Sequence, residues 1–347
     1  MQKETLTNKP RGLSPFLVGV VAALACETLF GLSYLFTKSA TDAHATEFAL
    51  MAWRFVFALV FMAILIAVRV IRINLRGKRL GPLFLIAFFS PVLYFIGETF
   101  GISHTTATET GIILGACPVA ALVASAIILR IKPTAREVLG IFIAVAGVVV
   151  AAGAKGLEAS LDVFGYAMLA LAAISYALYV VYVVRAKEFS AWEKTFVMIA
   201  IGAIVFAAGA VVEAIALGAQ GIGETGGIGT VGTNLATLAA LPFTNTGFLI
   251  AALYQGIGCS VGAYFFSVVA IAYLGANRTA SFVGFSTVVS IVAAMIFLHE
   301  SFTWLQAIGT VTILAGVYIA NMSAPEAADS EPQTTKENAR PLGTDAS

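Results

Sequence analysis

Charged side chains are scarce in this sequence. Only 11% of its 347 residues are Asp, Glu, Lys or Arg, and 59% are hydrophobic. Soluble domains carry roughly 25% charged and about 45–50% apolar residues. A water-soluble protein of this length needs far more charge to cover its surface. The composition therefore excludes a soluble domain and indicates an integral membrane protein.

Net charge, cysteine and histidine are also low, and each excludes a class of function. The net charge of +1 offers no polyanion-binding surface, so nucleic acid is not expected as a partner. The three cysteines lie in apolar runs without metal-ligand spacing, so we expect no disulfide framework and no metal site. No HExxH or GxxxxGK[ST] pattern occurs, and the three histidines fall at or near the expected outer loops, so the sequence predicts no enzyme, no cofactor and no ATP-driven pump.

Long apolar runs are what the chain does have. A bilayer core about 30 Å thick needs about 20 apolar residues in a helix. Ten runs of this kind are present: 15–37, 47–69, 81–102, 108–129, 136–153, 162–184, 194–217, 246–273, 279–298 and 303–321. The first follows basic residues, as a signal peptide would, but it is too long for one and is read as a retained helix.

The distribution of basic residues tests this count. With ten helices, seventeen of the twenty Lys and Arg residues fall on one side of the membrane, and only Lys38 and Lys155 fall on the other. Arg54 remains within the second helix. Because basic residues accumulate on the cytoplasmic side, both termini are expected there. We therefore predict an all-α membrane protein with ten transmembrane helices and cytoplasmic N and C termini.

The chain contains an internal repeat. Residues 110–151 align without a gap with residues 279–320, and thirteen positions are identical, including Gly140/Gly309 and Gly147/Gly316. Each half has five helices, an odd number, so the second half enters the membrane from the opposite side. The sequence thus predicts two inverted five-helix repeats with a binding site between them near the midplane, which is typical of a carrier.

The expected organisation has four parts. Residues 1–14 form a cytoplasmic tail, 15–153 the first repeat, 162–321 the second repeat, and 322–347 a disordered cytoplasmic tail. The second repeat carries an insertion in an outer loop at about 218–245, of which 229–241 is apolar enough to lie along the membrane surface.

The order of these motifs resembles the drug/metabolite transporter superfamily, in particular its EamA-type members. The resemblance rests on FGLSYLFTK in helix 1, MAWRF in helix 2, the segment TGIILGACPVAALVASAIIL with Pro118, and the two glycine pairs, and it covers about residues 15–321. Thr287 replaces the proline expected in the second half, Glu27 is unusual in helix 1, and the outer loop is long. The resemblance implies solute transport from a central cavity, often export of amino acids or other metabolites, without ATP hydrolysis.

Few ionisable residues fall inside the expected helices, and these are the candidate site. A charge near the bilayer centre costs at least about 2.5–3.5 kcal/mol unless it faces protein or water. Glu27 lies near mid-membrane, Arg54 lies about 12 Å from the outer side, and Glu98 lies near the outer end of helix 3. We expect Glu27, Arg54 and Glu98 to bind a charged or zwitterionic solute, with Glu27 as a candidate carrier of a coupling proton. The alternative is that Arg54 and a glutamate form a structural ion pair.

Uncharged groups complete the expected site. The polar and aromatic candidates on helices 1, 3, 6, 8 and 9 are Ser33, Tyr34, Tyr94, Tyr176, Gln255, Tyr264 and Ser286. For any one of them, hydrogen bonding between helices is an equally ordinary role. Pro91 and Pro118 are expected to kink helices 3 and 4 and are candidate gating positions.

Small residues form one stripe on each of helices 5 and 10 and indicate close packing. The partner is open: either another helix of the same chain or a second subunit in a homodimer.

The sequence therefore favours a multi-pass plasma-membrane carrier, and most of all an exporter, for a small polar or amphipathic metabolite. The alternatives are a channel-like facilitator and an uptake permease for another class of solute.

Overall fold

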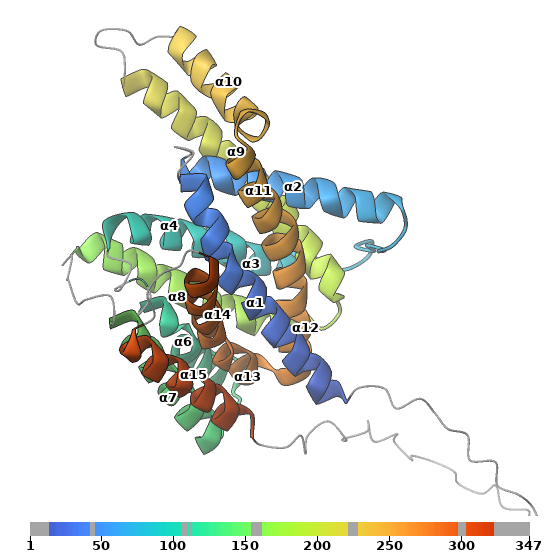
Figure 1. Ribbon diagram of the computed structural model, residues 1–347. Helices are drawn as coiled ribbons and strands as arrows, with labels where there is room; N and C mark the ends of the chain where they lie inside the picture. Colours follow the sequence, from blue (N-terminus) through green and yellow to red (C-terminus); the bar gives the residue numbers. More distant parts are fainter. Residues whose placement is uncertain are drawn as a thin grey trace, which may run out of the picture.

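The computed structural model of the chain describes residues 14–41, 46–105, 110, 113–153, 162–220, 228–297 and 303–322. These residues form helices and connecting turns, and no strand occurs among them (Figure 1). The first half comprises α1 (Pro15–Thr41), α2 (Glu47–Ala67), α3 (Gly81–Ala87), η1 (Phe88–Leu93), α4 (Tyr94–His104), α6 (Cys117–Ala124), η2 (Ser125–Leu129) and α7 (Ala135–Gly153). The second half comprises α8 (Val163–Arg185), α9 (Ala191–Gln220), α10 (Ile228–Thr244), α11 (Thr246–Leu253), η3 (Tyr254–Ala263), α12 (Tyr264–Leu274), α13 (Ala276–Ser281), α14 (Val283–Phe297) and α15 (Trp304–Asn321). The segments labelled η are π-helical.

Eight helical stretches of the described chain are long and apolar enough to cross a membrane. They are Pro15–Ser33, Phe48–Ala67, Gly81–Gly101, Val163–Arg185, Ala191–Ala216, Thr246–Leu274, Ala276–Phe297 and Trp304–Asn321. A shorter apolar helix, Ile113–Leu129, falls where the fourth span was expected, and α7 falls where the fifth was expected. The protein is thus a multi-pass membrane protein.

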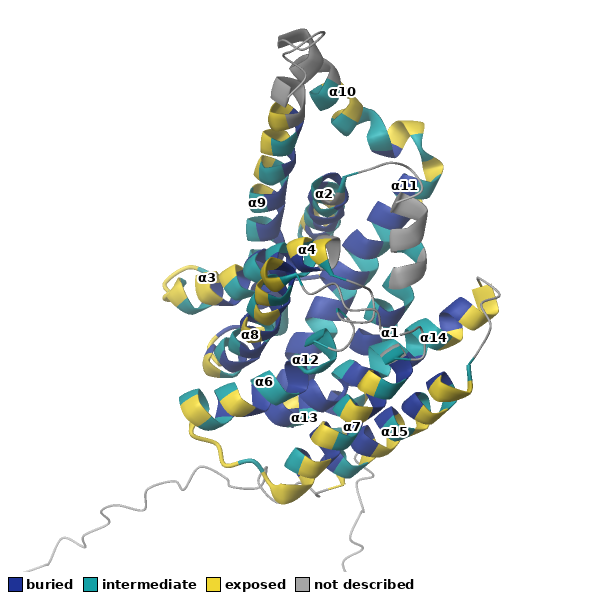
Figure 2. Cartoon of the chain, turned by 90° about the vertical axis from the view of Figure 1, so that its left-hand side faces the viewer, coloured by how far each residue is buried: buried dark blue, intermediate teal, exposed yellow. Residues whose placement is uncertain are grey.

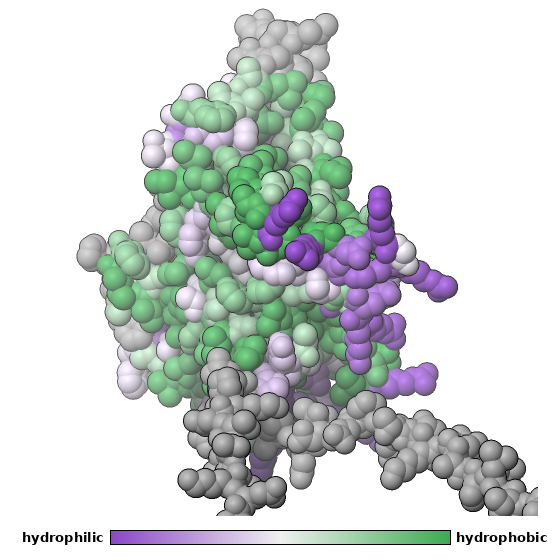
Figure 3. Space-filling model, turned by 90° about the vertical axis from the view of Figure 1, so that its right-hand side faces the viewer, coloured by the Kyte–Doolittle hydropathy of each residue, from purple (hydrophilic) through white to green (hydrophobic). Residues whose placement is uncertain are grey.

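The outer surface agrees with a lipid environment. Large apolar side chains are exposed on several helices, among them Ile127, Ile204 and Val311. Figure 3 shows one face that is mostly apolar, with hydrophilic side chains gathered along one part of it. Such a surface is unfavourable in water and favourable against acyl chains.

The interior is built by helices from both halves. α1 packs against η3, α12 and α14, whereas α2 packs against α9 and η3. Figure 2 shows α12 and α13 largely buried, while α7 and α15 each have an exposed outer face. The main hydrophobic cluster joins α2, the stretch from α3 to α4, α8, α9 and α12, and includes Phe55, Phe95 and Tyr264. The middle of the protein is therefore lined by both repeats.

The glycine stripes of α7 and α15 pack against each other. A Cβ on Gly140 would lie 2.6 Å from the carbonyl oxygen of Gly316, and one on Gly147 would lie 2.8 Å from that of Gly309. Both faces are consequently buried within one chain. Of the two partners that the sequence left open, the structure shows a helix of the same chain at both stripes.

The two repeats begin their last helix in the same way. At the start of α7, Thr134 and Glu137 exchange hydrogen bonds between side chain and backbone, and at the start of α15 Thr303 and Gln306 do the same. Such capping boxes satisfy N–H groups that a helix start leaves unpaired. Thr134 and Thr303 are equivalent positions of the repeat aligned above.

The two prolines lie at breaks in helical structure, although in different ways. Ser90, directly before Pro91, has extended backbone angles (φ −143°, ψ 120°) inside η1. Pro118 instead lies in the first turn of α6, where backbone N–H groups have no hydrogen-bond partner within the helix, so a proline there removes no helical hydrogen bond. The third span is therefore broken near its middle, whereas Pro118 begins a helical segment.

The insertion in the second half contains helix α10, which projects with the end of α9 beyond the other helices (Figure 1). The Trp53 indole donates a hydrogen bond to the carbonyl oxygen of Leu238 at 2.9 Å, and the Asn234 amide donates to that of Ala214 at 3.2 Å. α10 is thus attached to both α2 and α9. Residues 221–227 and most of both expected tails lie outside the described residues.

Candidate functional site

Arg54 of α2 is a buried guanidinium surrounded by neutral groups. Its side chain is 4% exposed. Nε donates to the Ser260 hydroxyl at 2.7 Å, and Nη1 donates to Oε1 of Gln255 at 3.4 Å. Cζ lies 4.6 Å from the centre of the Phe95 ring, within cation–π distance. Arg54 thus contacts the first repeat through Phe95 and the second through Gln255 and Ser260.

The guanidinium has no acidic partner. Among the residues that the structure describes, Arg54 takes part in no ion pair within 4.0 Å, and neither Glu27 nor Glu98 pairs with it. Nη2 is buried and makes no hydrogen bond. The structural ion pair considered above is therefore not present. A buried charge without a counter-charge is destabilising, so this arginine needs a reason other than stability.

The π-helical segment η3 positions the two acceptors of Arg54. Bonds of the i→i+5 type widen the helix, so that Gln255 and Ser260, five residues apart, both reach Arg54. In an α-helix they would lie about 140° apart at ~100° per residue. Gly256 is required beside them, because a Cβ there would lie 2.6 Å from the Arg54 carbonyl oxygen.

Tyr264 begins α12, directly after the π-helical segment that supplies the acceptors of Arg54. It is 4% exposed and belongs to the same buried hydrophobic cluster as Phe95. Its hydroxyl oxygen Oη is buried and makes no hydrogen bond that meets the distance and angle criteria among the described residues. The Phe30 ring packs edge-on against Tyr264, with centroids 6.1 Å apart.

Tyr94 and Glu98 form one side of the same region. The Tyr94 hydroxyl donates to Oε1 of Glu98 at 3.2 Å, one helical turn away on α4. The Tyr176 ring lies 6.5 Å from that of Tyr94. Three of the predicted residues therefore meet where α4 packs against α8.

Glu27 is 9% exposed and lies on α1 about one turn before Phe30, whose ring packs against Tyr264. The Cys26 thiol donates to Oε1 at 3.8 Å, and the Ser286 hydroxyl lies near the carboxylate. No ion pair of Glu27 is found in the described part of the chain. Glu27 is thus a second buried ionisable group in the same central region.

The remaining predicted residues have local roles or cannot be placed. The Ser286 hydroxyl donates to the Val283 carbonyl at 2.7 Å, and that of Ser33 donates to the Phe30 carbonyl at 2.6 Å. The side chain of Tyr34 lies outside the described residues.

Sequence reasoning missed Ser260 and Phe95, although both contact Arg54 directly. The available signal for Ser260 was the glycine-rich stretch Tyr254–Ala263, which departs from an ordinary apolar span. Phe95 gave no signal, because one phenylalanine among many apolar residues looks like lipid-facing or core sequence.

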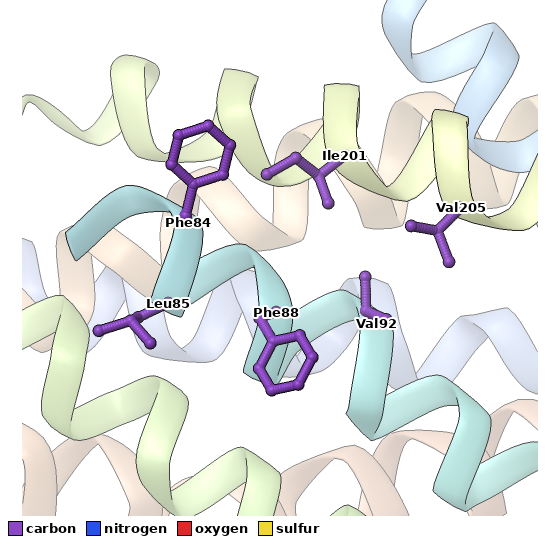
Figure 4. A pocket seen from close by; sticks show the side chains of 6 residues that line it. All are labelled: Phe84, Leu85, Phe88, Val92, Ile201 and Val205. Atoms are coloured by element: carbon purple, nitrogen blue, oxygen red, sulfur yellow. The ribbon is translucent and has the colours of Figure 1, made fainter. Parts of the chain in front are cut away.

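Two hollows in the described structure share no lining residue with this cluster. One, of about 470 Å³, is lined by Phe84, Leu85, Phe88, Val92, Ile201 and Val205 (Figure 4). Its lining carries no polar side chain, and Phe84 and Phe88 are exposed, so it suits an apolar chain rather than a polar solute. In the described ranges, no three His, Cys, Asp or Glu residues are grouped as metal ligands.

Apolar helices around buried polar groups contributed by two repeats define the transporter class of multi-pass membrane proteins. The chain belongs to the EamA-like transporter family, which matches residues 17–153 and again residues 163–322.

The chain is also similar to individual proteins. It is 30% identical over 305 residues to the uncharacterized transporter YcxC of Bacillus subtilis (strain 168), covering 87% of this chain and 92% of that protein. The chain also shares its fold with the crystal structure of another protein, with a TM-score of 0.67 and 18% sequence identity. The match covers 89% of this chain and 98% of the other.

Proposed function

We propose that this protein is a secondary transporter that exports a small metabolite, such as an amino acid or a related polar or amphipathic solute. The solute crosses by alternating access between the two repeats. The observation that carries this proposal is Arg54, a buried cation of the first repeat bonded to neutral groups of the second. A site shared by two repeats suits alternating access, because rocking one repeat against the other exposes the site first to one side and then to the other.

We further propose that the chain crosses the plasma membrane ten times, with α6–η2 and α7 as the fourth and fifth spans and both termini in the cytoplasm. Contacts between loops support this arrangement. Lys78 pairs with Glu193 at 2.8 Å, and Arg278 with Glu137 at 3.4 Å. His104 pairs with Asp162 at 3.2 Å. The first two pairs join segments assigned to the cytoplasmic side, and the third joins segments assigned to the outer side.

Coupling to protons would use Glu27. It is a buried carboxylic acid without an ion-pair partner in the described chain, and it lies near Cys26 and Ser286. Protonation removes the cost of burying its charge, so proton uptake and release can be linked to the conformation of the carrier. Pro91, at the break in the third span, is the proposed hinge for this motion.

Transport into and out of proteoliposomes tests the proposal. Purified protein is reconstituted, and the flux of a panel of amino acids and other metabolites is compared with that of empty vesicles. A carrier gives saturable flux and accelerated counterflow. Flux without saturation or counterflow would indicate a channel-like facilitator, inward accumulation driven by a gradient would indicate an uptake permease, and no flux with folded protein would contradict transport.

A further inference from the structure

Two buried donors of the central site make no hydrogen bond with the residues that the structure describes. They are Nη2 of Arg54 and the hydroxyl of Tyr264, and each is 4% exposed as a residue. Both residues border the same buried cluster, since the ring of Phe95 lies against the guanidinium and belongs with Tyr264 to that cluster. Buried polar groups are nearly always satisfied, so a neighbouring pair of unpaired donors needs an explanation.

The missing partner must be an acceptor and must carry negative charge. A guanidinium has five N–H donors and no acceptor. The two side chains that bond Arg54, Gln255 and Ser260, are neutral and leave its charge uncompensated. A carboxylate fits these requirements, since it accepts hydrogen bonds at both oxygens and pairs strongly with arginine.

The aromatic side chains around Arg54 and Tyr264 indicate whether the rest of the ligand is apolar or polar. The ring of Phe95 lies against one face of the guanidinium, and Phe30 packs against Tyr264. Phe55 lies 5.6 Å from Arg54 Cζ and belongs to the same buried cluster. A carboxylate here would therefore be attached to an apolar or aromatic body rather than to a sugar.

We infer that the solute of this transporter carries a carboxylate that binds Nη2 of Arg54 and the hydroxyl of Tyr264, with its apolar part against Phe95 and Phe30. This inference rests on the proposed transport function and narrows its substrate class. It excludes amines, neutral sugars and other solutes without an anionic group.

The test measures ligand binding to the purified full-length chain by thermal shift and by titration. The probes are three matched pairs: acetate and acetamide, butyrate and butyramide, and 3-phenylpropionate and 3-phenylpropionamide. A ligand that binds only the folded protein raises its unfolding temperature. We expect 3-phenylpropionate to stabilise the protein more than butyrate and acetate, and none of the amides to match its acid.

Variants then locate the binding site. Arg54→Gln should weaken the binding of 3-phenylpropionate at least about tenfold, equivalent to about 1.4 kcal/mol. Tyr264→Phe removes only a hydroxyl that makes no hydrogen bond with the described residues, so the protein should fold normally and bind about threefold or more weakly. Arg72→Gln, at an exposed arginine beyond the end of α2, is the matched control and should bind as the wild type does.

Three results would overturn the inference. In the first, no acid binds better than its amide. In the second, chloride replaces 3-phenylpropionate with equal effect in a methanesulfonate buffer, which would assign the site to a small inorganic anion. In the third, both site variants keep the preference for the acid.

The inference and the proposed function fail in different ways. Transport of a cationic or neutral solute that is unaffected by Arg54→Gln would support the proposed carrier function and contradict the carboxylate site. Binding that depends on Arg54, without flux of any solute, would support the carboxylate site and contradict the proposed transport function.

Discussion

Gly140 and Gly316 meet backbone to backbone where α7 crosses α15, since a Cβ on either would lie 2.6 Å from the carbonyl oxygen of the other. The internal repeat makes Gly140 equivalent to Gly309 and Gly147 equivalent to Gly316. Gly147 likewise meets Gly309. Exchanging the two repeats turns the first contact into the second, because each glycine is replaced by its equivalent in the other repeat. This relation is what a pseudo-two-fold axis between the two repeats requires.

The first prediction concerns this contact. Gly140→Ala should lower the unfolding temperature of the purified protein, because the added methyl group meets the backbone of Gly316 and Ala320. Overpacking of a close contact costs about 1–3 kcal/mol. Gly81→Ala is the matched control, since a Cβ at Gly81 meets nothing within 4 Å. Equal unfolding temperatures for the two variants would show that α7 and α15 are not in close contact.

The second prediction concerns Glu193, which is buried at the start of α9. Its carboxylate accepts hydrogen bonds from the backbone N–H groups of Asn74 and Ser190 and from Lys78. Glu193→Ala leaves these donors unpaired and should cost about 1–3 kcal/mol of stability, measured by thermal unfolding.

A double-mutant cycle checks the reason for that loss. Lys78→Met combined with Glu193→Ala should destabilise by less than the sum of the single changes. Glu188→Ala, at an exposed position nearby, should be almost neutral. Additive effects would mean that the ion pair contributes nothing.

The third prediction concerns proton coupling. Glu27→Gln should remove the pH dependence of transport in proteoliposomes, because an amide neither binds nor releases a proton, while the unfolding temperature stays close to that of the wild type. Glu213→Gln, near the far end of α9, should keep the wild-type profile. A pH profile unchanged by Glu27→Gln would exclude this residue as the proton carrier.

The fourth prediction concerns the start of α8. Asp162 accepts a hydrogen bond from the Gly165 N–H at 2.9 Å, and this bond, aided by His104, holds the pKa of Asp162 below its ordinary value of 3.8. A carboxylate with a lowered pKa in the folded protein stabilises it above the ordinary pKa, and the effect is lost as the pH falls through the lowered value.

Asp162→Asn should therefore reduce stability near neutral pH and flatten its decrease between roughly pH 5 and pH 3. Thermal unfolding across this range provides the measurement, with Glu188→Gln as a control at an exposed acid. A variant that loses stability on acidification as steeply as the wild type would show that Asp162 plays no part in the decrease.

Much of the candidate site could be selected from the sequence. Glu27, Arg54 and Glu98 stand out because charge is so rare in apolar helices. The hydrogen-bond partners of these residues could not be predicted from the sequence. They depend on which helices pack together, and the helices that meet at Arg54 are more than 200 residues apart in the chain. Arg54 meets Gln255 and Ser260 rather than a glutamate.

The sequence by itself determined that the chain lies in a membrane, where most of its helices begin and end, and that it is a duplication. These properties follow from local hydrophobicity and from repeated positions, neither of which needs a partner in space. Only the tertiary structure decided that the glycine stripes face each other within one chain and that a π-helix turns Ser260 towards Arg54. Such contacts depend on the packing of helices distant in sequence, and the apolar pattern of each helix alone is compatible with several neighbours.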